Sequence, residues 1–415
     1  MVLVIMVNSL FHTKCKVNIS HLTFCNCYDT FILKKIVCIF LTSLLFGHIN
    51  KKEVKFVKAL VVGGTGPTGP PMVEGLQKRG YQVAILHRGT HEVNFPSPVE
   101  HLHGDPFSKE SIEDTLGSRT FDIVISNYGR LRLIAQTMKG RTPRFIGIGG
   151  TGVYKDLVPK QRVPVGIPIP ISENAALQLD PDLDRVTNLM VISEQEVMQI
   201  HNQGHYNATI FRYPHIYGPR QNAPKDWSII RRIRDGRKYL VLPDGGLSLQ
   251  PKGYSENVAN AVMLGVDKPQ ESMGQIYNVR DEKVISLRER IELISQVMNH
   301  KWEEFIELPA RLAKPAEPYC QMPYGPGSYH VLIDITKIRN ELKYKDLFPI
   351  EEAIRKTVNW YLDNPLKPGG DEERRLGDPF DYEAEDKIID EFKKVSDRIR
   401  AITFAGKSHN ERGYQ

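Results

Sequence analysis

Ala59-Leu60-Val61-Val62-Gly63-Gly64-Thr65-Gly66-Pro67-Thr68-Gly69 is the stretch of sequence that decides the fold of this chain. A run of apolar, β-prone residues beginning at residue 54 ends in these glycines, and a helical pattern follows at 70–79. A second apolar strand pattern comes next, at 82–87. This order predicts a strand, a tight turn, a helix and a further strand.

The glycines give the turn the spacing G-x-x-G-x-x-G. We expect Gly63 to adopt a conformation closed to residues with a Cβ, and Gly66 to let a pyrophosphate approach the backbone. Gly69 then lets the helix pack close to the strand, and the helix N-terminus offers N–H groups and a partial positive charge. A flexible surface loop is the alternative, but the flanking strands and helix favour dinucleotide binding. The expected contacts are Gly63, Thr65, Gly66, Pro67, Thr68 and Gly69.

The composition is that of an ordinary globular protein. The chain has 415 residues, of which 41% are hydrophobic and 25% charged, and this length predicts two or three structural units. The net charge of +6 is modest, and the lysines and arginines are spread along the chain. Neither nucleic acid nor a membrane is therefore expected as a partner.

Four of the five cysteines lie in the first 38 residues: Cys15, Cys25, Cys27 and Cys38. The body of the chain keeps Cys320, which fits a reducing compartment, and we expect a cytoplasmic location. The spacing Cys25-x-Cys27 matches no common zinc pattern, so no metal site is predicted.

Residues 1–52 differ in kind from the rest and show no clean helical or strand period. Their apolar run at 36–47 is shorter than the roughly 20 residues that span a bilayer. A membrane anchor or signal, an unusual domain, and an extension whose start lies too far upstream all remain open. We favour the third, because a complete nucleotide-binding unit begins near Val54 without this segment.

From Val54 to about Arg220 the pattern alternates between strands and helices. The fold class predicted is α/β, a Rossmann-type doubly wound parallel sheet with a smaller C-terminal α/β lobe. Such a sheet places its ligand at the carboxyl ends of the strands. The predicted divisions are 1–52, an extension; 53–220, the nucleotide-binding domain; 221–365, a substrate lobe with strand returns to the sheet; and 366–415, a helical tail.

The predicted second strand is followed by His87 and Arg88, with no carboxylate to bind a ribose 2′-hydroxyl. An arginine there can pair with a 2′-phosphate, so we favour NADP(H) over NAD(H), the alternative for Arg88 being a solvated surface position. Asp105, after the third strand, is a candidate acceptor for the adenine amino group. The full set expected at these strand ends is His87, Arg88, Asp105, Pro106, Asn127, Tyr128, Gly129, Tyr213 and His215.

Several motifs together resemble the extended short-chain dehydrogenases/reductases, the NAD-dependent epimerase/dehydratase family. They cover roughly residues 57–365 and include, besides the glycine stretch, Gly104-Asp105, Val153-Tyr154, 212–220 (RYPHIYGPR), 253–259 (GYSENVA), 274–279 (GQIYNV) and 334–338 (DITKI). The resemblance implies a nicotinamide cofactor and a small-molecule substrate, such as a nucleotide sugar. Dimerisation through helices that flank the sheet is common in the family, so a homodimer is a further expectation.

The family's chemistry uses a tyrosine, a lysine four residues later and a serine or threonine that binds the substrate oxygen. In this chain no tyrosine or lysine occurs between Gln161 and His205. Matching Glu194 or Glu196 to the acidic residue usual on this helix puts the tyrosine position at Val186 or Asn188, and the lysine position at Met190 or Ile192. The usual serine falls on Gly150, with Thr151 one residue away. The catalytic dyad is absent.

Two classes of function follow from this departure. In the first, the chain is an enzyme with altered groups, in which Tyr154 replaces the acid and Thr151 holds a substrate oxygen, with Tyr128 and Arg130 near the same crevice. The alternative for Tyr154 is a packing role. In the second, the chain binds NADP(H) without turnover, as a sensor or scaffold. Plastid RNA-binding proteins with this fold also lack the dyad, but no basic–aromatic stacking surface is evident here.

The C-terminal part is expected to bind the substrate. Arginines on a predicted helix at 226–237 lie largely off its apolar stripe, so either they bind a substrate diphosphate or they are solvated. The expected substrate contacts are Arg130, Arg220, Arg231 and Tyr254. A Pro- and Gly-rich stretch at 307–328 is predicted as a loop over the cleft, and a late helix bearing Ile388, Ile389, Phe392, Val395 and Ile399 is expected to dock on the body or on a second subunit.

Overall fold

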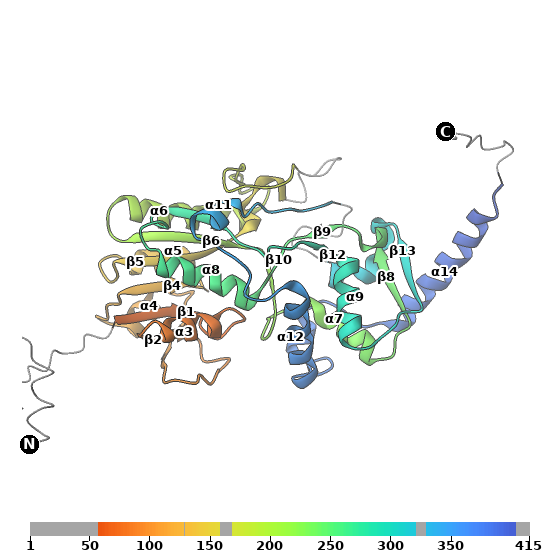
Figure 1. The fold of residues 1–415 in the computed structure, drawn as a ribbon, viewed down its shortest axis with the longest axis horizontal. Coiled ribbons are helices and arrows are strands. Elements are labelled where there is room, and N and C mark those ends of the chain that lie inside the picture. Colours follow the sequence, from red (N-terminus) through yellow and green to blue (C-terminus); the bar gives the residue numbers. More distant parts are fainter. Residues whose placement is uncertain (1–56, 128, 158–167, 321–328, 404–415) are drawn as a thin grey trace, which may run out of the picture. The chain divides into compact units, whose positions relative to one another are not determined.

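The computed structural model describes residues 57–127, 129–157, 168–320 and 329–403 (Figure 1). The N-terminal extension, with four of the cysteines and the apolar run, therefore lies outside the described residues, as does Tyr128. No helix in the described ranges is both long and apolar enough to cross a bilayer.

Seven parallel strands form the main sheet, in the order β11-β6-β5-β4-β1-β2-β3. Their bounds are β1 Val57–Val62, β2 Tyr81–His87, β3 Glu100–His103, β4 Ile123–Ser126, β5 Arg144–Gly150, β6 Asn207–Tyr213 and β11 Gln275–Asn278. The chain runs outward from β1 to β2 and β3 and then returns to the other side of β1 with β4. This reversal places a topological switch point between β1 and β4, where sheets of this type bind ligands.

Both faces of the sheet are buried, which is why its strands read as continuous apolar runs. In β1, Ala59 and Val61 pack toward one face, while Leu60 and Val62 pack toward the other. The first face is covered by α3 Gly69–Lys78, α8 Ser255–Asp267 and α11 Thr336–Glu341. The second is covered by α4 Lys109–Leu116, α5 Leu131–Thr137 and α6 Arg185–Asn202. The predicted doubly wound Rossmann-type sheet is confirmed.

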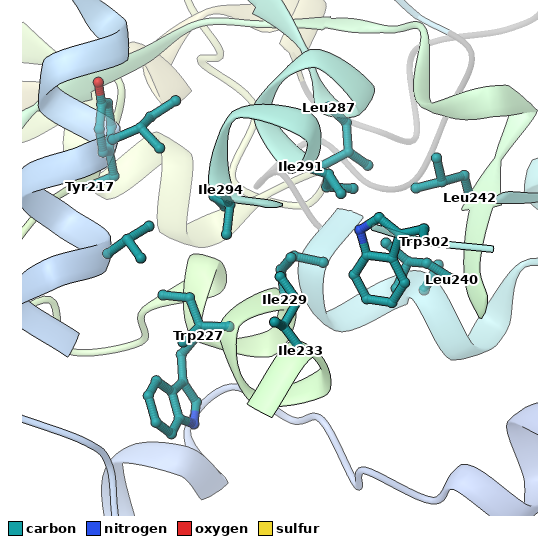
Figure 2. Packing of buried hydrophobic residues seen from close by; sticks show 14 of the residues in the cluster. Tyr217, Trp227, Ile229, Ile233, Leu240, Leu242, Leu287, Ile291, Ile294 and Trp302 are labelled. Atoms are coloured by element: carbon teal, nitrogen blue, oxygen red, sulfur yellow. The ribbon is translucent and has the colours of Figure 1, made fainter. Parts of the chain in front are cut away.

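A second hydrophobic core belongs to the C-terminal lobe. It lies between β8 Tyr239–Pro243, β13 Glu304–Leu308, α7 Lys225–Arg234, α9 Leu287–Val297 and α12 Ile350–Asp363. Figure 2 shows Trp227, Ile229 and Ile233 of α7 on one side of this core, with Leu287, Ile291 and Ile294 of α9 opposite. Ser286 caps the N-terminus of α9, because its hydroxyl accepts a hydrogen bond from the N–H of Glu289 at 3.1 Å.

Short strand pairs and helical turns complete the described fold. The pairs are β7 His215–Tyr217 with β10 Lys252–Tyr254, and β9 Leu249–Gln250 with β12 Ile285–Ser286. The remaining helices are α10 Glu317–Cys320, α13 Asp371–Arg374 and α14 Tyr382–Arg400, with single 3₁₀ turns that include Thr151–Val153.

The stretch at 307–328 is not a plain loop. Residues 304–308 alternate between polar and apolar side chains and pair with β8 as the parallel strand β13. Short helical turns occupy 310–320, and residues 321–328 lie outside the described part. This short strand pattern ends before Pro309, the first proline of the stretch.

The late amphipathic helix, α14, docks on the C-terminal lobe through Ile389, which is buried in the same core as α7. The contact also carries charge. Arg232 of α7 is buried and donates to Asp378 at 2.6 Å and to Glu385 of α14. Farther along α14, Val395 and Ile399 remain exposed.

Candidate functional site

A cavity of about 590 Å³ lies at the carboxyl ends of β1, β2 and β4, at the switch point of the sheet. Its walls come from the β1–α3 corner, the segment that follows β2, and Asn127 after β4. The far side is formed by Tyr213, Ile216 and residues of the C-terminal part of the chain. Among the residues expected to bind the cofactor, those that line this cavity are Gly63, Thr65, Gly66, Pro67, Thr68, His87, Arg88, Asn127 and Tyr213.

The three motif glycines meet different physical requirements. Gly63 has a φ of 85°, in the left-handed region that disfavours residues with a side chain. A Cβ on Gly69 would lie 2.2 Å from the carbonyl oxygen of Gly64, so a side chain at this position would prevent the helix from packing this close to the turn. A Cβ on Gly66, by contrast, would meet no protein atom within 4 Å, and this residue lines the cavity. Gly66 therefore leaves room for something outside the protein.

The start of α3 offers fewer hydrogen-bond donors than the motif predicted. Prolines at 67, 70 and 71 have no N–H, and the N–H of Gly69 donates to the carbonyl of Gly66 at 3.0 Å. The cavity-lining residues of the corner that still carry an N–H are Gly63, Thr65, Gly66 and Thr68, of which Gly63 donates to Leu86. A phosphate in this corner would depend on the other three, together with the threonine hydroxyls.

Asn127 ties the corner to the end of β4. Its side-chain oxygen accepts a hydrogen bond from the Thr68 hydroxyl at 3.1 Å, and its side-chain nitrogen donates to the Gly63 carbonyl at 3.4 Å. The Thr68 hydroxyl makes no capping bond to the helix, so it stays at the cavity wall. The side-chain amide of Asn127 thus holds the β1–α3 turn in its observed conformation.

The segment after β2 forms the end of the cavity at which an adenosine ribose would lie. His87 is 5% exposed, and Arg88 is exposed with its guanidinium 5.9 Å from the ring centroid of Phe107. The sequence has no carboxylate directly after β2. In the structure, however, Glu92 of the following segment lines the same wall, with its Oε2 4.0 Å from His87 Nε2. A carboxylate is therefore present at this end of the cavity.

The opposite wall carries an aromatic ring and two arginines. Arg220 has a φ of 60°, an uncommon conformation for a residue with a side chain, and its guanidinium lies 5.9 Å from the ring centroid of Trp360. Arg375 donates to the side chain of Asn222. These four residues all line the cavity, so anionic groups of a ligand would meet positive charge on this side.

Arg231, expected to bind substrate, does not line the cavity. Its guanidinium donates to Asp235 at 2.7 Å and to Glu373 at 2.8 Å. Glu373 is 4% exposed and also accepts from the Trp227 indole at 2.9 Å. Since Arg375 follows Glu373 by two residues, Arg231 acts as a positioning residue that anchors this part of the cavity wall.

The positions matched to the usual serine and to the usual lysine lie close together and carry no catalytic groups. A Cβ on Gly150, which falls on the usual serine position, would lie 2.8 Å from the Cε of Met190. Met190 is one of the two candidates for the lysine position. The two positions thus face each other in the structure, and neither carries an acid, a base or a hydroxyl.

Tyr154, the proposed substitute acid, is fully buried and does not reach the cavity. Its hydroxyl donates to the Asn278 side chain at 2.6 Å and accepts from Arg212 at 2.9 Å. Arg212 in turn pairs with Glu194 at 2.8 Å in the same buried network. Burial raises the pKa of Tyr154 to about 12, against the influence of Arg212. This placement matches the packing alternative for Tyr154. Thr151, 1% exposed, also lies outside the lining.

Other expected contacts occupy structural positions away from the cavity lining. The Asp105 carboxylate accepts from the N–H of Phe107 at 3.0 Å and so closes a turn. Gly129 has a φ of 93°, and a Cβ there would lie 2.7 Å from the Cβ of Pro106, so this glycine is required by its neighbour. Arg130 precedes α5 as its N-cap residue and is exposed.

His215 and Tyr254, also expected as contacts, lie outside the lining, as do Gly69 and Pro106. Burial, together with the charge of Lys252, lowers the pKa of His215 to about 3, so this histidine is neutral at pH 7. Tyr254 is fully buried, and its hydroxyl donates to Glu256 at 2.8 Å.

Two groups of residues at or beside the cavity were not expected from the sequence. One is the cavity wall contributed by Trp360, Glu372 and Arg375, which no motif marks because it comes together through the tertiary packing of α12 and α13. The other is a cluster of His87, Glu92, His101 and His103, whose ligand-type atoms all lie within 4.8 Å of one another. The signal available for the second group was the pattern His101-x-His103 on one strand beside a histidine that ends the neighbouring strand.

Comparison with known proteins agrees with the fold. Residues 191–279, from α6 to the end of β11, match the model of the NAD dependent epimerase/dehydratase family. A dTDP-glucose 4,6-dehydratase from Bacillus anthracis in complex with NAD superposes with a TM-score of 0.58 at 15% identity, covering 74% of this chain and 97% of that one. A UDP-glucose 4-epimerase from Bifidobacterium longum in complex with NAD⁺ and UDP superposes with a TM-score of 0.58 at 15% identity. The match covers 74% of this chain and 99% of that one. The predicted resemblance to this family is confirmed.

Two sequence relatives differ from each other in what their names describe. The chloroplast stem-loop binding protein of 41 kDa b of Arabidopsis thaliana is 25% identical over 247 residues, 55% of this chain. A 3-diazoavenalumate denitrifying reductase of a Streptomyces species is 24% identical over 242 residues, 54% of this chain. The matched regions cover 60% of the first relative's length and 77% of the second's.

Proposed function

We propose that this chain, which resembles the NAD-dependent epimerase/dehydratase family, binds NADP(H) in the cavity at the switch point, with the diphosphate in the β1–α3 corner. The observation that carries the proposal is the open space over Gly66, where a side chain would meet the cavity and no protein atom. Main-chain N–H groups and the start of α3 would face the phosphates there. NAD is named in complexes of the structural neighbours, which supports a nicotinamide cofactor.

The preference for NADP(H) rests on Arg88. Arg88 lines the end of the cavity at which we propose that an adenosine 2′-phosphate would lie, and a guanidinium can pair with such a phosphate. Glu92 is the group that would favour NAD(H), since a carboxylate accepts from a ribose 2′-hydroxyl and repels a phosphate. In this structure the Glu92 carboxylate faces His101 at 2.9 Å and His103 at 3.3 Å, so both of its oxygens already contact side chains of the protein.

Replacing Arg88 with aspartate should weaken the binding of NADPH by roughly 10- to 100-fold, the value of one charged hydrogen bond, and should change NADH binding much less. Dissociation constants for both nucleotides can be measured by fluorescence titration of the full chain. Arg132→Asp makes the same charge change at an exposed position of α5 outside the cavity and serves as the control. Equal losses for NADPH and NADH would remove Arg88 from this role.

For the bound cofactor we propose a reaction on a nucleotide sugar or a related carbonyl compound. Arg220, Arg375 and Trp360 supply the cationic and aromatic wall that a nucleotide diphosphate and base would use. Such a reaction cannot use the family's tyrosine–lysine pair, because the chain lacks it. Proton transfer would have to come from a group of the substrate, from water or from a side chain of the cavity wall.

A second candidate is binding of NADP(H) without turnover, as a sensor or scaffold. It is favoured by the contact between the Gly150 position and Met190, which fills the dyad region with apolar atoms. A third, RNA binding, is raised by the similarity to the chloroplast stem-loop binding protein. These functions can be distinguished by titrating purified protein with NADPH and then following the absorbance of NADPH with a panel of sugar nucleotides. Oxidation of NADPH or conversion of a sugar nucleotide to product supports the enzyme, binding with neither supports the sensor, and RNA retention without NADPH binding contradicts both.

A further inference from the structure

Four side chains that bind transition metals converge on one face at the edge of the main sheet. His101 and His103 are two residues apart on β3, so they point to the same face, and His103 is directly paired with His87 at the end of β2. The segment that connects β2 to β3 crosses this face and adds Glu92. Sequence spacing predicted no metal site, and none of these four residues belongs to the cysteine pattern considered there.

The distances within the cluster are those of a metal site. His101 Nδ1 lies 2.9 Å from Glu92 Oε2, His103 Nε2 lies 3.3 Å from Glu92 Oε1, and His87 Nε2 lies 3.1 Å from His101 Nδ1. Ligands at ~2.0–2.1 Å from a tetrahedral zinc ion are separated from one another by about 3.3 Å. All four ligand-type atoms lie within 4.8 Å of one another, so one ion could reach all of them.

The contacts of His87 and His101 do not all fit one arrangement of hydrogens while Gly89 donates to His87. The N–H of Gly89 donates to His87 Nδ1 at 3.2 Å, so a neutral His87 carries its hydrogen on Nε2 and points it at His101 Nδ1. His101 Nδ1 must then accept, yet it also faces the carboxylate of Glu92, which has no hydrogen to give. If His101 is protonated instead, two N–H groups face each other. While Gly89 donates to His87, one short contact is therefore repulsive in either state of His101. A metal ion held by these acceptors would separate His87 from His101, provided that the Gly89 contact opens.

We propose that His101, His103, Glu92 and His87 form a binding site for a divalent transition metal, with zinc as the ion that best suits three imidazoles and a carboxylate. Coordination through His87 Nε2 requires a hydrogen on Nδ1, so the Gly89 contact must open. His87 is therefore the weakest of the four ligands.

The metal would fix the wall of the cavity. The loop from Arg88 to Val93 lines the end expected to bind adenosine, and Glu92 lies within it. Coordination of Glu92 to histidines of β3 would hold this loop against the sheet and cancel its carboxylate charge. The site would then be structural, beside the nucleotide and apart from the reacting atoms.

The test uses the full chain, freed of metal with a chelator and titrated with zinc by calorimetry in the absence of nucleotide. We expect one zinc ion bound per chain at this site. Loss of a residue that only hydrogen-bonds to a metal ligand costs roughly 10- to 100-fold in metal affinity. His101→Ala and His103→Ala should each weaken zinc binding by more than this, and His87→Ala should weaken it less. His91→Ala, in the same loop but outside the cluster, is the control and should bind zinc normally.

Cobalt substitution identifies the ligands independently of the variants. The site should give the visible absorption of tetrahedral cobalt without thiolate-to-cobalt charge transfer, which separates it from binding by the cysteines at 15–38. The proposal is overturned if zinc binding is absent, if it survives in the His101/His103 double alanine variant, or if the cobalt spectrum shows thiolate ligands alone. Circular dichroism of each variant confirms that a loss reflects the site and not unfolding. Because no nucleotide is present, failure here leaves the proposed NADP(H) binding untouched.

Discussion

Replacing Gly66 with valine is expected to reduce NADPH binding by at least about a hundredfold, equivalent to roughly 2.8 kcal/mol, while the protein stays folded. A side chain at this position meets no protein atom within 4 Å and projects into the cavity, where the diphosphate is proposed to lie. Gly66 also lies outside the left-handed region, so valine is tolerated by the backbone. The thermal midpoint should therefore change little, whereas fluorescence titration with NADPH should show the loss.

Two further variants make this result specific. Gly152→Val places a side chain in open space outside the cavity and should leave NADPH binding intact. Gly69→Ala puts a methyl group against the Gly64 carbonyl, so it should lower both binding and stability. If Gly66→Val binds NADPH as well as the unaltered chain does, the diphosphate does not lie in this corner.

The second large effect concerns stability. Arg232→Met should lower the free energy of unfolding by about 3–5 kcal/mol, because it leaves buried carboxylates without their cation. In the native chain Arg232, 1% exposed, donates to Asp378 at 2.6 and 3.1 Å and also to Glu385. Arg237 lies 3.7 Å from Glu385 and offsets part of the loss there, so Asp378 carries most of the penalty.

The control for this prediction is on the same helix. Arg234→Met removes an exposed arginine of α7 whose guanidinium lies 5.5 Å from the ring centroid of Trp227, and it should change stability by no more than about 1 kcal/mol. Urea unfolding of the three proteins, followed by circular dichroism, gives the comparison. Equal midpoints for Arg232→Met and Arg234→Met would mean that the buried ion pairs do not hold the C-terminal segment on its lobe.

The parts of this fold set by local patterns could be predicted from the sequence. The runs around Val61 and Ile85 gave parallel strands buried on both faces, and Gly63 and Gly69 gave the turn, because backbone conformation and close packing leave few alternatives at these positions. The start of α9 at Ser286 was also predictable, since a hydroxyl followed by an apolar helical period is a local signal.

The rest depended on contacts between segments far apart in the chain. Arg231 reads as a free cation on a helix, and only the fold brings Glu373 beside it. Tyr154 follows a strand in the family's order, yet its hydroxyl is taken up by Asn278 and Arg212. Glu92 does not directly follow β2 in the sequence, but the path of its loop brings its carboxylate close to the end of that strand. Pairings of this kind carry no periodic signal in the sequence.

The most direct test of the account is a crystal structure of the full chain with NADP⁺. The account predicts that the diphosphate lies against the main chain of Thr65, Gly66 and Thr68, with the adenosine end directed toward Arg88. A nucleotide bound elsewhere, or a cavity that stays empty at saturating NADP⁺, would contradict it.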